Sequence, residues 1–229
     1  GAPDWVHAAP IPDDYRGAYK RSDPDAGPKY ARHVREIIDK LKQTGIGLAG
    51  FIAESLPSVG GQIIPPRGYL ADVYRYVRAA GGICIADEVQ TGFGRIGTHF
   101  WGFEAQEVIP DIVVLGKPIG NGHPLGAVVT TRAIAEASDN GMEYFSTFGG
   151  NPFVTTVALA VLTEILDAQL SERAAKIGAY FLGCLRNLAE RCPIVREARG
   201  KGLMLALELS VPAKPIVDRC LERGLLILA

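Results

Sequence analysis

The chain has 229 residues, of which 48% are apolar and 21% are charged, a composition that is ordinary for a globular protein. Its 24 Lys and Arg residues are balanced by 25 Asp and Glu residues, so no basic excess indicates nucleic acid and no polybasic run indicates an anionic membrane surface. Apolar runs such as Ile109–Leu115 are far shorter than the roughly 20 residues of a membrane span, so we expect no membrane protein.

The front half of the chain alternates between helical and strand-like patterns. Residues 1–28 are rich in Pro, Asp and Gly and predict an extended arm or linker. Apolar residues at helical spacing, each run followed by glycine, predict helices over 29–44 and 69–80. Short apolar runs predict buried strands, which are 48–53, 83–86, 112–115 and 125–130. Strand, helix and strand joined by short links predict an α/β fold with a parallel sheet.

The rear half has a different rhythm, which indicates a second, smaller α+β domain. Helices are predicted at 153–169, 171–191 and 213–223, and strands at 194–199, 203–209 and 225–228. We place the boundary within 165–172, so that 29–168 belong to a large domain and 169–229 to a small one. The chain starts without Met and stops inside an apolar run, so we expect a fragment of a longer protein.

Three charged residues follow predicted buried strands. They are Glu54, Asp87 and Lys117, and in a parallel sheet ligands bind beyond the carboxyl ends of the strands. A lysine at the rim of an apolar core can form a Schiff base with an aldehyde cofactor. A nearby carboxylate needs a cationic partner, and a protonated pyridine nitrogen would serve. A plain Asp87–Lys117 ion pair at the sheet edge is the alternative.

Two other patterns point away from common sites. Gly92-Phe-Gly-Arg-Ile-Gly97 fits a dinucleotide-binding fingerprint, but it neither follows its strand directly nor opens a helix, so we reject that site. The four cysteines form no CxxC pair, so we expect neither a metal site nor disulfides. We expect them to be small buried residues of a cytoplasmic protein.

Four ordered segments resemble the class-III pyridoxal-phosphate-dependent aminotransferases. They are Ala86–Arg95 (ADEVQTGFGR), Pro110–Pro118 (PDIVVLGKP), Thr147–Pro152 (TFGGNP) and Arg199–Leu203 (RGKGL). The resemblance implies fold type I, with part of the large cofactor-binding domain in 29–168 and part of the small domain in 169–229. It also implies a pyridoxal 5′-phosphate cofactor and a homodimer with a shared active site.

The resemblance assigns roles to five residues. Lys117 forms the Schiff base and later moves the proton of the substrate carbon. Asp87 pairs with the pyridine nitrogen, Val89 packs against the ring, and Gln90 lies near the phenolic oxygen. Thr147 binds the cofactor phosphate of the neighbouring subunit.

A narrower resemblance is to the ethanolamine-phosphate and phosphohydroxylysine phospho-lyases. It rests on Ala53–Pro66, Gly116–Pro124, Gly141–Phe145 and Pro12–Gly17, and on Val59 where the transaminases carry a second acid. It implies that the protein eliminates phosphate from a primary amine and gives aldehyde, ammonia and phosphate. The alternatives are an ω-amino transaminase that uses a keto-acid acceptor, and a non-catalytic dimerising fragment.

Three residues are weaker candidates for contacts with the substrate, a small amine that carries a phosphate in the phospho-lyase case. Glu54 orients cofactor or substrate amine, or forms a structural ion pair. Arg95 binds a substrate anion, or forms a loop salt bridge. His123 senses phosphate or proton state, or is a turn residue. Family members are about twice as long, and their upstream half supplies a glycine-rich phosphate loop, so we expect weak cofactor binding or none in the 229 residues alone.

Overall fold

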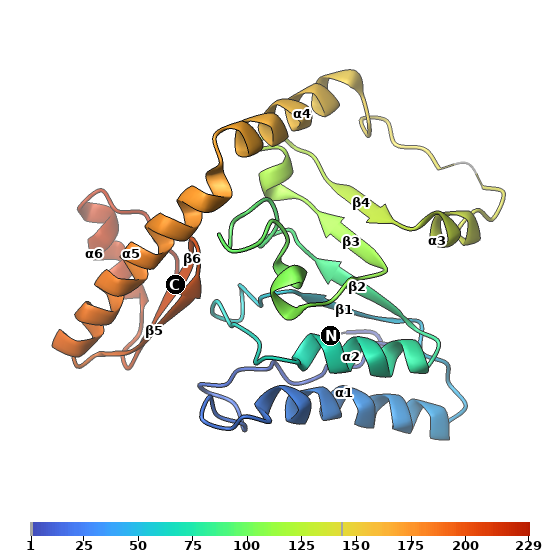
Figure 1. Cartoon of the computed structure of the whole chain (residues 1–229), viewed down its shortest axis with the longest axis horizontal. Helices are drawn as coiled ribbons and strands as arrows, with labels where there is room; N and C mark the ends of the chain where they lie inside the picture. The colour runs from blue at the N-terminus through green and yellow to red at the C-terminus, as the bar shows by residue number, and fades with distance from the viewer. Residues whose placement is uncertain (1, 143) are drawn as a thin grey trace.

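The computed structural model describes residues 2–142 and 144–229 (Figure 1). Glu143, within the predicted motif Gly141–Phe145, lies outside the described residues. The front half contains the helices α1 (Ala26–Gln43) and α2 (Tyr69–Ala79), and the strands β1 (Gly50–Glu54), β2 (Ile83–Asp87), β3 (Ile112–Leu115) and β4 (Ala127–Thr130). Two short 3-10 helices, η1 (Gly102–Gln106) and η2 (Lys117–Ile119), lie between these strands. The predicted α/β class and these strands are confirmed.

The four strands form one sheet in the order β1-β2-β3-β4. The pairs β1–β2 and β2–β3 are parallel, as the sequence predicts, whereas β4 runs antiparallel to β3. The sheet is therefore mostly parallel, as predicted, with β4 as its antiparallel strand. Only residues 116–126 join β3 to β4, which suits a chain that turns back, because a parallel neighbour needs a crossover of roughly a dozen residues or more.

Helix α2 packs on β2, and α1 packs alongside α2 (Figure 1). Tyr30, Val34 and Ile38 of α1 meet Val73 and Val77 of α2 in one buried cluster. Their spacing of three to four residues puts them on one face of each helix. This layer fixes the sheet, and with it the carboxyl ends of β1 to β3.

The rear half leaves the sheet through two long helices. α4 (Pro152–Asp167) and α5 (Leu170–Arg191) are separated by Ala168 and by Gln169, whose φ is +48°. α5 packs on a two-stranded antiparallel sheet of β5 (Val195–Lys201) and β6 (Met204–Leu209), and α6 (Lys214–Glu222) follows. A further short helix, α3 (Arg132–Ala137), precedes α4. The helix break lies within 165–172, and the division into two domains remains a prediction.

Two local predictions are wrong. Residues 225–228 form no strand, and Leu226 and Leu228 are 79% and 94% exposed, because an apolar run needs a neighbouring strand to pair with. Of the four cysteines predicted to be buried, Cys184 is exposed, and Cys192 and Cys220 are half-buried. Cys84 is buried as expected, and burial raises the pKa of its thiol to about 12.

Within the described residues no single helix has both the length and the apolar character of a membrane span. Only α4 and α5 taken together reach them, and this pair is bent by 62°.

Candidate active site

A cavity of about 810 Å³ lies between the carboxyl edge of the main sheet and strand β6. One side is formed by Val89, Gln90 and Arg95 from the loop after β2, and by Lys117 and the following segment to Leu125. The opposite side comes from residues 203–205 at the start of β6 and from Gln62. Its size is in the range of small-molecule and cofactor sites.

Lys117 follows β3 directly and enters this cavity with an unusual backbone. Its φ is +36°, and Asn121 in the same segment has a φ of +44°. Side chains with a Cβ rarely adopt such angles, and residues held in them cluster at functional sites. Lys117 is exposed. A flexible amine that faces an open cavity is available to a ligand.

Asp87 is the last residue of β2, in register with Glu54 of β1 and Val114 of β3. Its Oδ1 accepts a hydrogen bond of 2.9 Å from the backbone N–H of Val89, which stabilises the turn that brings Val89 to the cavity. The methyl groups of Val89 would lie 3.4 Å from a Cβ on Gly116, next to Lys117. The ion pairs in the described part of the chain do not include Asp87 with Lys117.

Glu88 carries a structural role that sequence reasoning missed. Its side chain is fully buried, and its carboxylate accepts hydrogen bonds from Thr91 Oγ1 at 2.8 Å and from the backbone N–H groups of Gly102 at 2.7 Å and Phe103 at 2.9 Å. The Ser55 hydroxyl donates a fourth. The signal was strand alternation, because Cys84, Ala86 and Glu88 share the buried face. Glu88 therefore ties the turn after Asp87 to β1 and η1.

The weaker candidates divide between the cavity and its surroundings. Arg95 is exposed, lines the cavity, and has no ion-pair partner in residues 2–142 and 144–229. His123 lines it too, with its ring edge-to-face on Phe153 at 5.1 Å, while its backbone N–H closes a turn with Gly120. The loop salt bridge considered for Arg95 is therefore not found, whereas His123 is both a turn residue and a cavity residue.

Asp87, Glu54 and Thr147 are not among the residues that line the cavity. Glu54 Oε2 accepts hydrogen bonds from the backbone N–H of Ser58, at 2.9 Å, and from the Ser58 hydroxyl, so Glu54 holds its own turn. Thr147 is exposed on the segment between α3 and α4. Their roles toward cofactor or substrate stay predictions.

The glycines of the rejected dinucleotide pattern serve close packing. A Cβ on Gly94 would meet Ser171 Oγ, and one on Gly97 would lie 2.7 Å from the backbone of Ala175 in α5. No helix opens in this segment. Asp111, which precedes β3, accepts hydrogen bonds from Arg78 Nη2 at 2.9 Å and from the Cys84 N–H at 2.7 Å. The structure thus supports the rejection.

The charges around the cavity are cationic. The charged residues in its lining are Arg95 and Lys117, His123 adds an imidazole, and no carboxylate lines it. Over the described ranges no group of three or more His, Cys, Asp or Glu side chains is placed to hold a metal ion. A free lysine amine, an apolar face from Val89 and a cationic lining fit an anionic aldehyde cofactor such as pyridoxal phosphate.

Comparison with known proteins agrees with this reading. The family model described as aminotransferase class-III matches residues 3–229. The chain is 50% identical over 211 residues to the alanine–glyoxylate aminotransferase 2-like protein of Drosophila melanogaster, which covers 90% of the chain and 43% of that protein. It is 39% identical over 218 residues to ethanolamine-phosphate phospho-lyase homolog 1 of Caenorhabditis elegans, covering 90% of the chain and 47% of that protein.

Solved structures are similar in fold as well as in sequence. A phospholyase from Arthrobacter, solved in complex with phosphoethanolamine, superposes with a TM-score of 0.87 and 36% identity over 97% of this chain and 55% of that one. The chain spans about half the length of these relatives. Enzymes of this family use pyridoxal phosphate. The chain belongs to the class-III aminotransferase family.

Proposed function

We propose that the complete protein that carries this chain is a pyridoxal-phosphate enzyme that eliminates phosphate from a small phosphorylated amine. The observation that carries the proposal is the cavity, whose lining combines Lys117, Arg95 and His123 with no carboxylate. Such a lining favours a substrate that is itself anionic. Val59, at the position where transaminases of this family carry a second acid, is 89% exposed and offers no charge for an arginine switch between two substrates.

Each of these residues has a separate role in the proposed reaction. When the cofactor is bound, Val89 would pack against its ring and Gln90 would lie near its phenolic oxygen. Asp87, whose Oδ1 accepts a hydrogen bond from the Val89 N–H, would pair with the pyridine nitrogen. Pyridoxal phosphate, when bound there, supplies the electron sink for a carbanion beside the amine nitrogen. Lys117 removes the proton from that carbon. Arg95 faces the phosphate and compensates its negative charge.

The elimination balances without an external oxidant. The C–H bond beside nitrogen breaks with its proton passing to Lys117, and the C–O bond to phosphate on the next carbon breaks with its electron pair leaving on phosphate. One water then hydrolyses the unsaturated amine. Phosphoethanolamine plus water thus gives acetaldehyde, ammonia and inorganic phosphate.

The test incubates the complete protein, loaded with pyridoxal phosphate, with phosphoethanolamine and no keto acid. Equal amounts of ammonia and phosphate are expected, and Lys117→Ala should release neither. Release that begins only when a keto acid is added, with transfer of nitrogen to it, would replace this proposal by transamination. That second candidate is favoured by the 50% identity to the aminotransferase 2-like relative.

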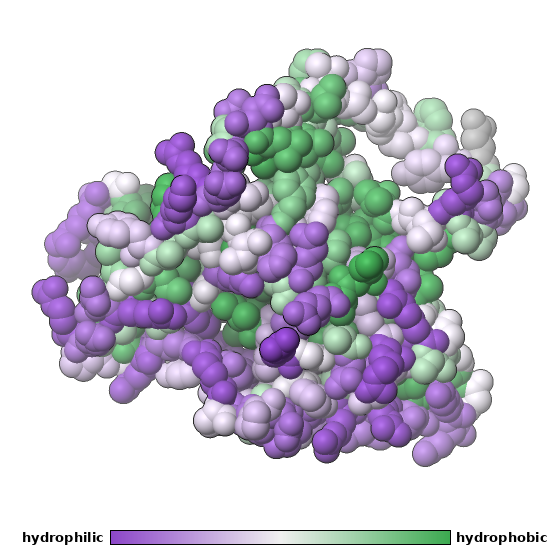
Figure 2. Space-filling model, in the orientation of Figure 1, coloured by the Kyte–Doolittle hydropathy of each residue, from purple (hydrophilic) through white to green (hydrophobic). Residues whose placement is uncertain are grey.

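The same proposal includes a homodimer. Thr147 is exposed away from the cavity of its own chain, near Phe145 and Phe148, which are 77% and 81% exposed. Apolar side chains also gather along α4 (Figure 2). Mixing inactive Lys117→Ala protein with Thr147→Ala protein should recover activity, because one site of the mixed dimer is then intact. No recovery after subunit exchange would place Thr147 in its own subunit's site or outside any site.

A further inference from the structure

The loop Gly60–Gln62 brings an unsatisfied polar group to the cavity. Gln62 lines the same cavity as Lys117 and has a φ of +57°. Its Oε1 is buried and has no hydrogen-bond partner among the described residues. A buried amide without a partner costs roughly 1–3 kcal/mol. The residue that carries this amide lines the cavity, so the amide is within reach of a ligand there.

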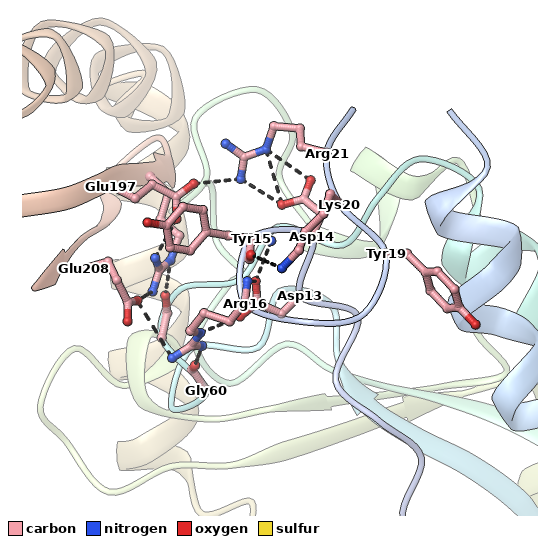
Figure 3. Close-up of polar contacts among 12 residues, drawn as sticks. Asp13, Asp14, Tyr15, Arg16, Tyr19, Lys20, Arg21, Gly60, Glu197 and Glu208 are labelled. Atoms are coloured by element: carbon pink, nitrogen blue, oxygen red, sulfur yellow. Dashed lines mark hydrogen bonds and ion pairs between the residues drawn. The ribbon is translucent and has the colours of Figure 1, made fainter. Parts of the chain in front are cut away.

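Two arginines hold this loop from outside. The guanidinium of Arg16, on the arm, donates to the carbonyl of Gly60 (Figure 3). Arg199 Nε, on β5, donates to the carbonyl of Gly61 at 2.7 Å. Both loop carbonyls that precede Gln62 are therefore fixed by charged donors, which make stronger hydrogen bonds than neutral ones.

Acidic residues hold the two arginines in turn. Arg199 is 7% exposed and contacts Glu197 Oε2 and Glu208 Oε2, each at 2.7 Å. Arg16 Nε lies 2.6 Å from Asp13 Oδ2 (Figure 3). The guanidinium groups are thus oriented by the arm and by the β5–β6 sheet. The Gly60–Gln62 loop is clamped between them.

Gly61 is the residue that permits this clamp. Its φ is +115°, and a Cβ there would lie 3.0 Å from Arg199 Nη2 and 3.1 Å from Arg16 Nη2. Any side chain would therefore push against both guanidinium groups and strain the backbone. The sequence Gly-Gly-Gln thus places the Gln62 amide at the cavity, on a loop that is hydrogen-bonded to both the arm and the β5–β6 sheet.

We propose that Gln62 is a specificity residue that donates its amide N–H to the phosphate of the substrate, and that Arg16 and Arg199 position it. This rests on the proposed phospho-lyase function. Because the amide oxygen is the buried atom, the amide nitrogen is the atom left to face the ligand, and its N–H groups are donors. Arg95, on the other side of the cavity, supplies charge, whereas Gln62 supplies a directed donor.

The test compares Gln62→Ala and Gln62→Glu with wild type in the complete, cofactor-loaded protein. For Gln62→Ala we expect the KM for phosphoethanolamine to rise about 10-fold or more, as for a lost hydrogen bond to a charged group. Gln62→Glu should raise it further, because a carboxylate repels phosphate. The kcat and the bound pyridoxal phosphate should stay unchanged. Ile64→Ala, a neighbour outside the cavity lining, is the matched control.

Positioning is tested by Arg16→Ala alone and combined with Gln62→Ala. Arg16→Ala should raise KM, but the double variant should show no further rise beyond Gln62→Ala, because the clamp acts through Gln62. If the increase in KM of the double variant equals the product of the two single increases, the positioning role of Arg16 is overturned. An unchanged KM in Gln62→Ala, or a loss of cofactor with KM unchanged, would overturn the role of Gln62.

Inorganic phosphate separates this inference from the proposed function. If wild type releases no phosphate from phosphoethanolamine, the proposed function fails. The affinity for inorganic phosphate, measured by calorimetry on wild type and Gln62→Ala, then decides on Gln62. Weaker binding by the variant supports a phosphate contact at Gln62, and equal binding overturns it.

Discussion

Lys117 has a strained backbone and an accessible amine, and a lysine with a purely structural role requires neither. Its backbone is held at a φ of +36°, and its amine stays exposed toward the cavity. Strained backbone of this kind costs about 1–3 kcal/mol and persists only where surrounding structure imposes it. Gly116, extended with a φ of −165°, and the packing of Val89 on it provide that surrounding structure.

Borohydride reduction of the complete protein with pyridoxal phosphate should therefore attach one cofactor to the Lys117 peptide. Lys117→Ala should abolish the adduct, as read by mass mapping. Lys201→Ala is a demanding control, because burial lowers the pKa of the Lys201 amine and makes it a better nucleophile than an ordinary lysine. An adduct that persists in Lys117→Ala would contradict the assignment.

Replacing Glu88 by Gln should destabilise the fold, although the two side chains have nearly the same shape. The carboxylate accepts four hydrogen bonds, and an amide nitrogen in its place turns N–H groups toward N–H donors. We expect the free energy of unfolding to fall by about 2–4 kcal/mol, which would lower the melting temperature by several degrees. Glu107→Gln, whose carboxylate is exposed and 3.8 Å from Arg67, should change almost nothing.

At the residue scale, the role of Glu88 and part of the cavity wall could not be predicted from the sequence. The motif predicts that Val89, Gln90 and Lys117 meet, and they line one cavity. The opposite wall at Leu203 was not foreseen, because it depends on the long-range hydrogen bond of its N–H to the Arg95 carbonyl at 3.0 Å. Contacts between distant segments leave no local pattern.

At the scale of elements, apolar runs predict β2 and β3, which each have a strand on either side, and also the edge strand β1. Their period and length then suffice. The direction of β4 and the absence of a strand at 225–228 depend instead on which partners lie nearby, which a run of apolar letters does not reveal.

The packing of α5 on the β5–β6 turn gives a sharper prediction at this scale. Alanine in place of glycine normally stabilises a helix by up to about 1 kcal/mol. At Gly178 the added Cβ would lie 2.0 Å from the carbonyl oxygen of Gly202, whereas at Gly183 nothing lies within 4 Å. Gly178→Ala should therefore lower the melting temperature and Gly183→Ala should leave it unchanged or raise it. The same sign for both would contradict this packing.

At the scale of the whole molecule, the arm joins the two halves through charges. Arg21 pairs with Asp14 of the arm at 2.8 Å and with Glu197 of β5 at 2.8 Å, and Arg16 lies 3.8 Å from Glu208 (Figure 3). Helices α4 and α5 are the other connection (Figure 1). The cavity between the sheet and β6 thus depends on an electrostatic junction as well as on a helical one.

This junction should loosen in acid. Burial raises the pKa of Asp13, but hydrogen bonds from the Arg16 backbone and guanidinium and from the Tyr15 N–H outweigh it, so the pKa lies below its usual 3.8. A lowered pKa in the folded state means that the stabilisation is complete above 3.8 and is lost as the pH falls through the folded value. The hydrogen-exchange protection factors of residues 12–21, which correct for the intrinsic exchange rate at each pH, should therefore fall below about pH 4 more than those of α2.

Asp13→Asn separates this titration from general acid unfolding. The amide keeps the shape but offers Arg16 no charge, so residues 12–21 should exchange faster already at pH 7 and should lose the acid-dependent step. Asp72→Asn is the matched control, because Asp72 pairs with Arg75 within α2 at 2.6 Å, and no ion pair joins it to the arm among the described residues. An arm that opens at the same pH in Asp13→Asn as in wild type would show that other carboxylates govern the junction, with Asp14 and Glu197, both on Arg21, the next to change.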